Sequence, residues 1–230
     1  MLGLPDGTRA CLFDLDGVLT QTARVHAAAW KQMFDEYLKA RGEPEFTEHD
    51  YDAYVDGKPR DDGVRSFLES RGIHEPEERI EELGDKKNEL VQRLIHEHGV
   101  ETYDGSIRYV EAVRDAGLRR AVVSSSANTH EVLKVTGIAD LFEEVVDGVV
   151  AQREHLPGKP APDMFLAGAR AVDTDPKHAA VFEDALAGVQ AGRAGGFGLV
   201  VGVDRVGQAD ALREHGADVV VKDLSELLAE

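Results

Sequence analysis

Short apolar runs recur along the chain and alternate with longer segments in which apolar residues repeat at helical spacing. A short apolar run bounded by polar residues is typical of a strand that is buried on both faces. The alternation of such strands with amphipathic helices predicts an α/β fold, a Rossmann-like parallel sheet covered by helices. The runs that predict strands are 10–13, 121–123, 145–146, 179–182, 198–203 and 218–221.

Between these runs, apolar residues fall three or four positions apart, as the buried face of a helix requires. Gly117 and Gly137 stand where two of the helices should end, and Pro162 stands where another should begin. The predicted helices are 22–41, 107–116, 129–136, 162–171, 185–194 and 224–229.

The segment from 42 to 104 has a different pattern, without any strand-like apolar run. Acidic residues, lysines and helix formers dominate it, and glycines separate short amphipathic stretches. We therefore expect two domains: an α/β core formed by 1–21 and 105–230, and an inserted all-helical cap domain formed by 22–104. Because the insertion follows the first strand directly, the cap should lie over the carboxyl ends of the strands.

Polar clusters follow three of the predicted strands, and a fourth cluster precedes a predicted helix. In open parallel sheets, ligands bind beyond the carboxyl ends of the strands. The sequence thus predicts that all four clusters converge on one site. The clusters are Asp14 with Asp16, Ser124-Ser125-Ser126, Gly158-Lys159-Pro160, and Glu183-Asp184.

The first and last clusters predict a magnesium site. Two carboxylates two residues apart repel each other, and a divalent cation would relieve that repulsion. Carboxylate and carbonyl oxygens suit Mg²⁺, which also keeps water and substrate phosphate as ligands. The expected ligands are Asp14, the backbone carbonyl of Asp16, Asp184 and Glu183. The alternative for the first cluster is an ordinary acidic loop.

The two middle clusters predict phosphate binding. Hydroxyl and amide groups of Ser124, Ser125 and Ser126 precede a helix whose amino terminus favours an anion. Lys159 could pair with Asp14 and with phosphoryl oxygens. The alternatives are that the serines, together with Asn128, only cap a helix and that Lys159 is a solvated charge.

Net charge and cysteine content limit the partners and the compartment. The formal net charge of −18 argues against nucleic acid or an anionic membrane surface as a partner. A single cysteine excludes an internal disulfide and agrees with a cytoplasmic location. We see no apolar run long enough to span a membrane and no secretory signal. We expect a monomer or a weak homodimer.

The four clusters, in this order, resemble the motifs of the haloacid dehalogenase superfamily of phosphotransferases. The resemblance covers nearly the whole chain, because one subclass carries its helical cap directly after the first motif. The matching stretches are Asp14-Leu15-Asp16-Gly17-Val18, Ser124, Lys159-Pro160-Ala161-Pro162-Asp163, and Glu183-Asp184-Ala185 with Gly188.

Within the superfamily, the chain is similar to the β-phosphoglucomutase subgroup, although Gln21 and Ala127 depart from its pattern. The resemblance implies that the cap and its flanks bind a sugar phosphate, with an arginine on the distal phosphate. His26 and Trp30 could instead be a packed hinge pair, and Arg60 a solvated charge. The residues that carry this similarity are Thr22, His26, Trp30, Gly57, Lys58, Arg60, Lys87, Asn88, Ser124, Ser125, Ser126 and Asn128.

The resemblance implies a Mg²⁺-dependent phosphotransferase that acts on a hexose phosphate and converts β-glucose 1-phosphate to glucose 6-phosphate. Asp14 would be the nucleophile that forms an aspartyl phosphate, and Asp16 the general acid and base. Lys159 would complete the catalytic set. Two alternatives are a phosphatase for sugar phosphates or other small phosphomonoesters, and a non-catalytic protein that binds a phosphorylated metabolite.

Overall fold

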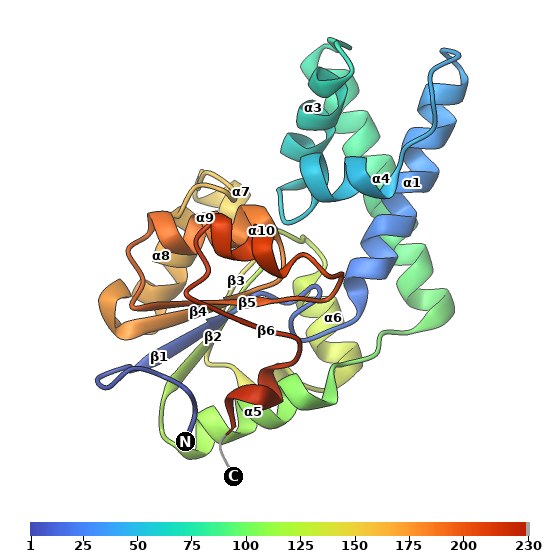
Figure 1. The fold of residues 1–230 in the computed structure, drawn as a ribbon. Coiled ribbons are helices and arrows are strands. Elements are labelled where there is room, and N and C mark those ends of the chain that lie inside the picture. The colour runs from blue at the N-terminus through green and yellow to red at the C-terminus, as the bar shows by residue number, and fades with distance from the viewer. Residues whose placement is uncertain (229–230) are drawn as a thin grey trace.

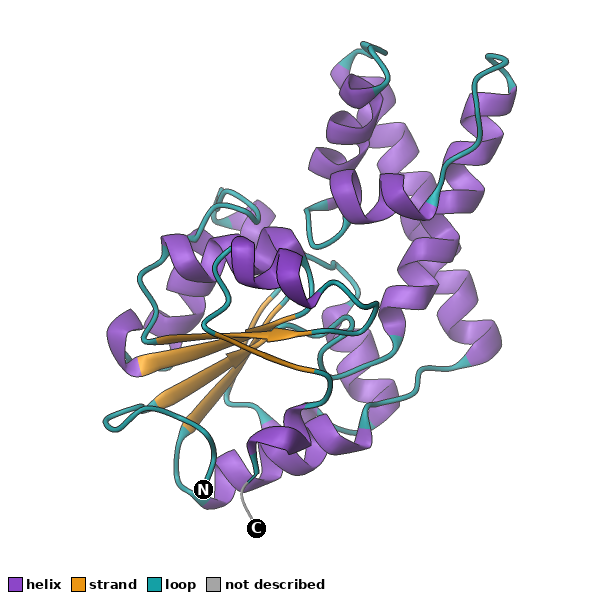
Figure 2. Cartoon of the chain, viewed as in Figure 1, coloured by secondary structure: helices purple, strands orange, loops and turns teal. Residues whose placement is uncertain are grey.

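A computed structural model describes residues 1–228 and contains a six-stranded sheet, all of whose strand pairs are parallel. Figures 1 and 2 show its place in the fold. The strands lie in the order β3-β2-β1-β4-β5-β6, with β1 and β4 at the centre. The α/β fold predicted from the sequence is confirmed. The strands are β1 (Ala10–Phe13), β2 (Arg119–Val123), β3 (Glu144–Val146), β4 (Ala179–Glu183), β5 (Leu199–Val203) and β6 (Val219–Val221).

The register of the central strands aligns their carboxyl ends. Phe13 at the end of β1 pairs with Val122 of β2 on one side and with Phe182 of β4 on the other. All four residues of β1 are fully buried, as their uniform apolar character predicts. The residues that follow these strands, Asp14 and Ser124 among them, therefore emerge at one edge of the sheet.

Helices cover both faces of the sheet. In Figure 1, α7, α8, α9 and α10 lie on one face, and α5 and α6 lie on the other. Each face has its own apolar cluster, one around Phe165 and Val181 and the other around Phe13 and Phe182. The helices are α5 (Asp104–Asp115), α6 (Thr129–Thr136), α7 (Gly148–Arg153), α8 (Asp163–Ala171), α9 (Leu186–Ala194) and α10 (Ala209–Glu214).

The remaining helices form a separate group, the cap helices, which stand beyond the carboxyl edge of the sheet (Figure 1). They belong to the segment between β1 and α5 and contain no strand. They comprise α1 (Thr22–Lys39), α2 (Glu48–Asp50), a π-helical turn (Tyr51–Val55), α3 (Arg60–Ser70) and α4 (Glu77–His98). None of the described helices is long and apolar enough to cross a membrane.

The two linkers to the cap helices run side by side. Thr20 and Thr102 form an antiparallel bridge. The Gln21 amide donates to the Glu101 carbonyl at 2.8 Å, and the Tyr103 amide donates to the Leu19 carbonyl at 2.9 Å. The chain therefore enters and leaves the cap helices through one hydrogen-bonded pair of segments.

The helices differ from the sequence prediction in four places. The short helices α7 and α10 were not predicted, and α4 is one long helix where several short ones were expected. A helix of about one and a half turns is too short to show a clear apolar period. The predicted helix 224–229 is a 3₁₀ turn at Leu224–Leu227, and residue 229 lies outside the described residues.

Candidate active site

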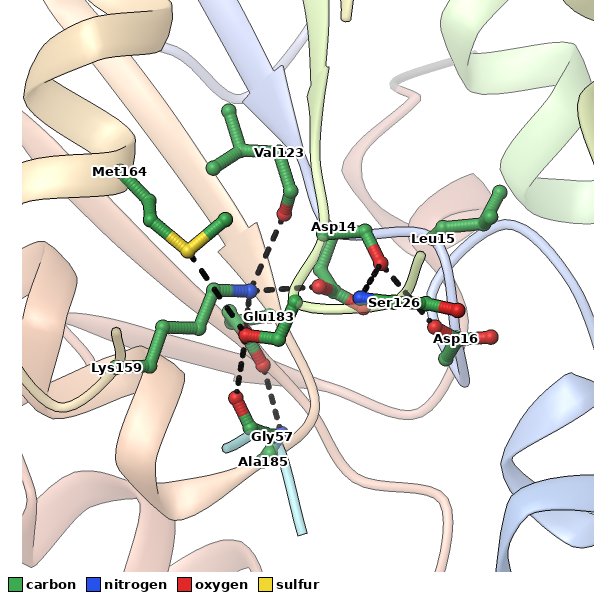
Figure 3. Close-up of polar contacts among 12 residues, drawn as sticks. Asp14, Leu15, Asp16, Gly57, Val123, Ser126, Lys159, Met164, Glu183 and Ala185 are labelled. Carbon is green, nitrogen blue, oxygen red and sulfur yellow. Dashed lines mark hydrogen bonds and ion pairs between the residues drawn. The ribbon is translucent and has the colours of Figure 1, made fainter. Parts of the chain in front are cut away.

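A buried lysine lies between two carboxylates at the carboxyl edge of the sheet. Lys159 Nζ is 2.6 Å from Asp14 Oδ1 and 2.6 Å from Glu183 Oε1, and it also donates to the Val123 carbonyl at 3.2 Å (Figure 3). The other oxygen of Glu183 accepts from the Ala185 amide at 2.8 Å. The Lys159 ammonium and both oxygens of Glu183 are thus engaged, which fixes Lys159 against Asp14.

Burial and mutual repulsion set the charges of this triad. Burial raises the pKa of Asp14 well above its usual range; Lys159 opposes the rise, and the carboxylates of Glu183 and Asp16 add to it. Burial alone would lower the pKa of Lys159, but Asp14 and Glu183 outweigh it and raise this pKa above its ordinary value. Lys159 is therefore a permanent cation beside the candidate nucleophile.

Asp16 lies in a different environment from Asp14. Its carboxylate accepts hydrogen bonds from Thr22 and, at 3.2 Å, from Ser124, and His26 Nε2 lies 3.4 Å away. Burial opposes the ionisation of Asp16, but His26, Thr22 and Lys87 outweigh it and hold its pKa below the usual range. Thr22 and Ser124 therefore hold the Asp16 carboxylate in one orientation, and its pKa is shifted in the opposite direction to that of Asp14.

Lys87, which the sequence also singled out, contacts His26 and Trp30 at this point. Lys87 Nζ is 2.8 Å from His26 Nδ1 and 4.8 Å from the centre of the Trp30 ring. Burial lowers the pKa of Lys87 to about 7, although Asp16 opposes this shift. The structure thus brings Lys87, His26 and Asp16 into one chain of contacts.

Gly17 lets the first loop pass close to Asp184. Its φ of +86° lies in the left-handed region, and a Cβ built on it would overlap the Asp184 carboxylate. Burial raises the pKa of Asp184 well above its usual range, and the carboxylates of Asp56, Glu183 and Asp14 add to the effect. The turn after Asp16 thus allows the aspartates of two separate motifs to approach each other.

The serine cluster has several roles rather than one. Ser124 donates to Asp16, and Ser125 donates to the Gly57 carbonyl of the cap at 2.9 Å. Ser126 Oγ accepts from the Asn128 amide at 3.1 Å. Only part of the cluster therefore keeps free hydroxyls for a ligand, and Ser125 instead connects the core to the cap.

Asn128 also contacts the cap. Its side-chain amide donates to Asn88 at 2.9 Å, and its side-chain carbonyl accepts from Gln92 at 3.2 Å. Neither contact was predicted from the sequence, because α4 could not be placed against α6 from the sequence pattern.

A cavity of about 390 Å³ lies between the cap helices and the strand ends. This volume is within the range of small-molecule sites. Nearly all the predicted cap residues line it, but two have partners there: Lys58 donates to Ser66 at 2.8 Å, and Arg60 pairs with Asp85 at 3.0 Å and with Asp61 at 3.3 Å. The predicted residues that line it are Asp14, Asp16, His26, Trp30, Gly57, Lys58, Arg60, Lys87, Ser125, Ser126, Asn128, Glu183 and Asp184.

Sequence reasoning missed Asp56, which lines the same cavity next to Gly57. Burial raises the pKa of Asp56 to about 7, and a hydrogen bond with Tyr51 opposes the rise. No spacing or motif marks this residue. Its position follows from the π-helical turn that precedes it.

Within residues 1–228, no group of three or more Asp, Glu, His or Cys side chains is arranged to hold a metal ion by itself. The oxygen atoms of Asp14, Asp16 and Asp184 nevertheless lie around one end of the cavity. The donors are all oxygens, which suits a hard cation such as Mg²⁺, since it needs few protein carboxylates.

Comparisons with known proteins agree with this geometry. The profile of the haloacid dehalogenase-like hydrolase family matches residues 8–196. The chain therefore belongs to the haloacid dehalogenase-like hydrolase family.

Its relatives include β-phosphoglucomutases. That of Mycobacterium bovis is 54% identical, over 99% of this chain and 94% of its own length. That of Bacillus subtilis is 32% identical, over 96% of this chain and 92% of its own. The structure of β-phosphoglucomutase from Clostridium difficile has a TM-score of 0.81 at 26% identity and covers 96% of this chain and 93% of its own.

Proposed function

We propose that this protein is a β-phosphoglucomutase, which isomerises β-glucose 1-phosphate to glucose 6-phosphate through an aspartyl phosphate on Asp14. The observation that carries the proposal is the pairing of Asp14 with Lys159 at a cavity, beside Asp16, whose pKa is lowered while that of Asp14 is raised. The similarity to two β-phosphoglucomutases over nearly the whole chain supports this substrate.

Asp14 and Lys159 have complementary roles. Asp14 attacks phosphorus in line with the leaving oxygen, and the bond between phosphorus and that oxygen breaks. The Lys159 ammonium, held by Glu183, neutralises the repulsion between the Asp14 carboxylate and the incoming phosphate. We assign Glu183 to orienting Lys159, since both of its oxygens already have protein partners.

Asp16 moves the proton. Its low pKa keeps it ionised in the free protein, so it begins the cycle as a base toward a sugar hydroxyl that attacks the phosphate on Asp14. The same carboxyl, now protonated, returns the proton to the leaving oxygen after the bisphosphate has turned around. Thr22 and Ser124 hold its carboxylate in place throughout.

Asp14, Asp184 and the backbone carbonyl of Asp16 would hold Mg²⁺. When bound, Mg²⁺ neutralises phosphoryl charge. The cap helices, which we propose form a cap domain over the site, exclude water so that the sugar hydroxyl is the acceptor. Arg60, Ser126 and Asn128 also line the cavity, and they would hold the second phosphate.

Phosphorus NMR tests the proposal. The protein is incubated with β-glucose 1-phosphate, Mg²⁺ and a trace of the glucose bisphosphate, with α-glucose 1-phosphate as a control for the anomer. We expect glucose 6-phosphate from the β anomer only. Release of inorganic phosphate without glucose 6-phosphate would identify a phosphatase, and no reaction with either anomer would favour a non-catalytic binding protein.

A further inference from the structure

Arg205 reaches from the loop between β5 and α10 to the turn that follows the two catalytic aspartates. Its Nε donates to the Gly17 carbonyl at 2.8 Å, and its Nη2 lies 3.3 Å from the Val18 carbonyl. The side chain is only 14% exposed. Arg205 lies outside the set of residues that line the cavity, so none of the chemistry above uses it.

The same guanidinium contacts the linker that returns from the cap helices. Its central carbon lies 3.6 Å from the centre of the Tyr103 ring, and Nη2 is 3.2 Å from Ser106 Oγ. The Tyr103 amide is itself bonded to the Leu19 carbonyl. Arg205 therefore touches the returning linker at Tyr103 and the turn that leads into the other linker.

A third set of contacts anchors Arg205 to the core. Its Nη1 donates to the Lys222 carbonyl at 2.8 Å and lies 3.5 Å from Asp223. Asp223 is fixed in turn by the Ser225 amide at 2.9 Å. The guanidinium thus joins three segments that are far apart in the sequence.

The chemistry of the side chain suits this task. A guanidinium has five donors in a rigid planar fork and can also stack on an aromatic ring, whereas an ammonium is a point charge. A partly buried carbonyl that loses its donor destabilises the folded state. Lysine could satisfy one carbonyl but could not hold Gly17, Lys222 and Tyr103 together.

We propose that Arg205 is a positioning residue that fixes the turn after Asp16 to the hinge of the cap helices. The cap can then pivot on its paired linkers without displacing Asp14 or Asp16. The inference about the hinge stands on the contacts alone. Its kinetic consequence rests on the proposed use of Asp14 and Asp16.

Hydrogen–deuterium exchange tests the inference without any substrate. In Arg205→Ala, we expect the amides of Gly17, Gln21 and Tyr103 to exchange at least tenfold faster, with the amides of β4 and β5 unchanged. Arg205→Lys should give an intermediate increase. Arg193→Ala is the matched control. Arg193 is also an arginine of the core, but its side chain is 67% exposed and its ion pair with Asp218 is long, at 3.4 Å.

Kinetics with a small aryl phosphate provide the second readout. A displacement of about 1 Å in catalytic groups can reduce the rate by about 10²-fold. We therefore expect Arg205→Ala to lower kcat by about that factor, with KM within threefold and Arg205→Lys in between.

Each other outcome is decisive. Unchanged exchange in the turn and linkers would overturn the inference, as would equally faster exchange throughout the sheet, which would mean that Arg205 only stabilises the fold. If the parent fails to isomerise β-glucose 1-phosphate, the proposed function fails, but the exchange result still decides the role of Arg205.

Discussion

Asp14 and Asp16 are identical side chains two residues apart, yet their environments drive their pKa values in opposite directions. Burial beside Glu183 raises the pKa of Asp14, while the partners of Asp16 lower its pKa. Pairs of carboxyl groups whose pKa values diverge are a frequent sign of divided acid–base roles. Asp16 is thus ionised, as a general base must be, and the contact with Lys159, rather than the pKa, supports Asp14 as the nucleophile.

Asp14→Asn should abolish turnover with little effect on folding. The amide is nearly isosteric but a poor nucleophile, so activity should fall by several orders of magnitude. Because burial already disfavours the charge on Asp14, its removal should change the melting temperature little. Turnover of an aryl phosphate and thermal unfolding measure the two effects. Activity within tenfold of the parent would contradict the nucleophile assignment.

Lys87→Met should change the pH dependence of stability. The pKa of Lys87 is lowered from 10.5 to about 7 in the folded chain, so between these values only the unfolded chain carries the proton. The stability of the parent relative to the variant should therefore rise with pH, by at most about 1.4 kcal/mol per pH unit. Melting curves from pH 7.5 to 9.5 measure this trend.

The control for this measurement is Lys86→Met, the neighbouring exposed lysine, which pairs with Glu36 at 2.7 Å. Its melting temperature should follow that of the parent at each pH. If the melting temperature of Lys87→Met also follows that of the parent at each pH, Lys87 keeps its proton in the folded protein.

At the scale of elements, the six strands were predicted to within two residues because each combines an apolar run with a polar end. The site residues at strand ends were predictable for the same reason, since register alone brings Asp14, Ser124 and Glu183 together. Asp56 and Arg205 were not predictable. Their roles depend on a π-helical turn and on packing between distant segments, which leave no local pattern.

Gly17→Ala tests the turn that follows β1. The substitution combines a left-handed φ of +86° with overlap of the new Cβ and the Asp184 carboxylate. Gly72→Ala is the control, because Gly72 has a φ of +67° and open space around its Cβ position. A left-handed non-glycine residue costs about 1–2 kcal/mol, which both variants should show.

Only Gly17→Ala should also lose activity, by at least about 100-fold, because Asp184 must move. Aryl phosphate turnover and thermal unfolding separate the two contributions. Equal activity in the two variants would show that the close approach of Gly17 to Asp184 is unimportant.

At the scale of the whole molecule, residues from two parts of the chain line the cavity. Asp14 and Asp16 come from the loop after β1, and Arg60 and Lys58 come from the segment of the cap helices. A mutase must hold a second phosphate far from Asp14, whereas a phosphatase need not. The side chain that holds this phosphate therefore separates the two functions.

Arg60→Ala should damage isomerisation of β-glucose 1-phosphate far more than hydrolysis of an aryl phosphate. Truncating one partner of a desolvated charge pair costs about 2–5 kcal/mol, which is a loss of about 30-fold or more. Hydrolysis of the small ester should stay within threefold. Parallel assays on the two substrates measure the ratio.

Arg65→Ala is the matched control, since Arg65 also lies on α3 and pairs with Asp62 at 2.8 Å and Glu77 at 2.6 Å, but does not itself line the cavity. It should leave both rates unchanged. If Arg60→Ala lowers the rates on both substrates equally, Arg60 does not hold the second phosphate, and a phosphatase is favoured.

The paired linkers have a consequence for how such a protein can change. Because Gln21 and Glu101 are one hydrogen bond apart, the cap helices are a single contiguous insertion whose two ends meet. Asp14, Lys159 and Glu183 lie outside that insertion, and Trp30, Arg60 and Lys87 lie within it. Replacing one uninterrupted stretch of sequence could therefore give the protein a new substrate while the strand order and the proposed catalytic residues stay the same.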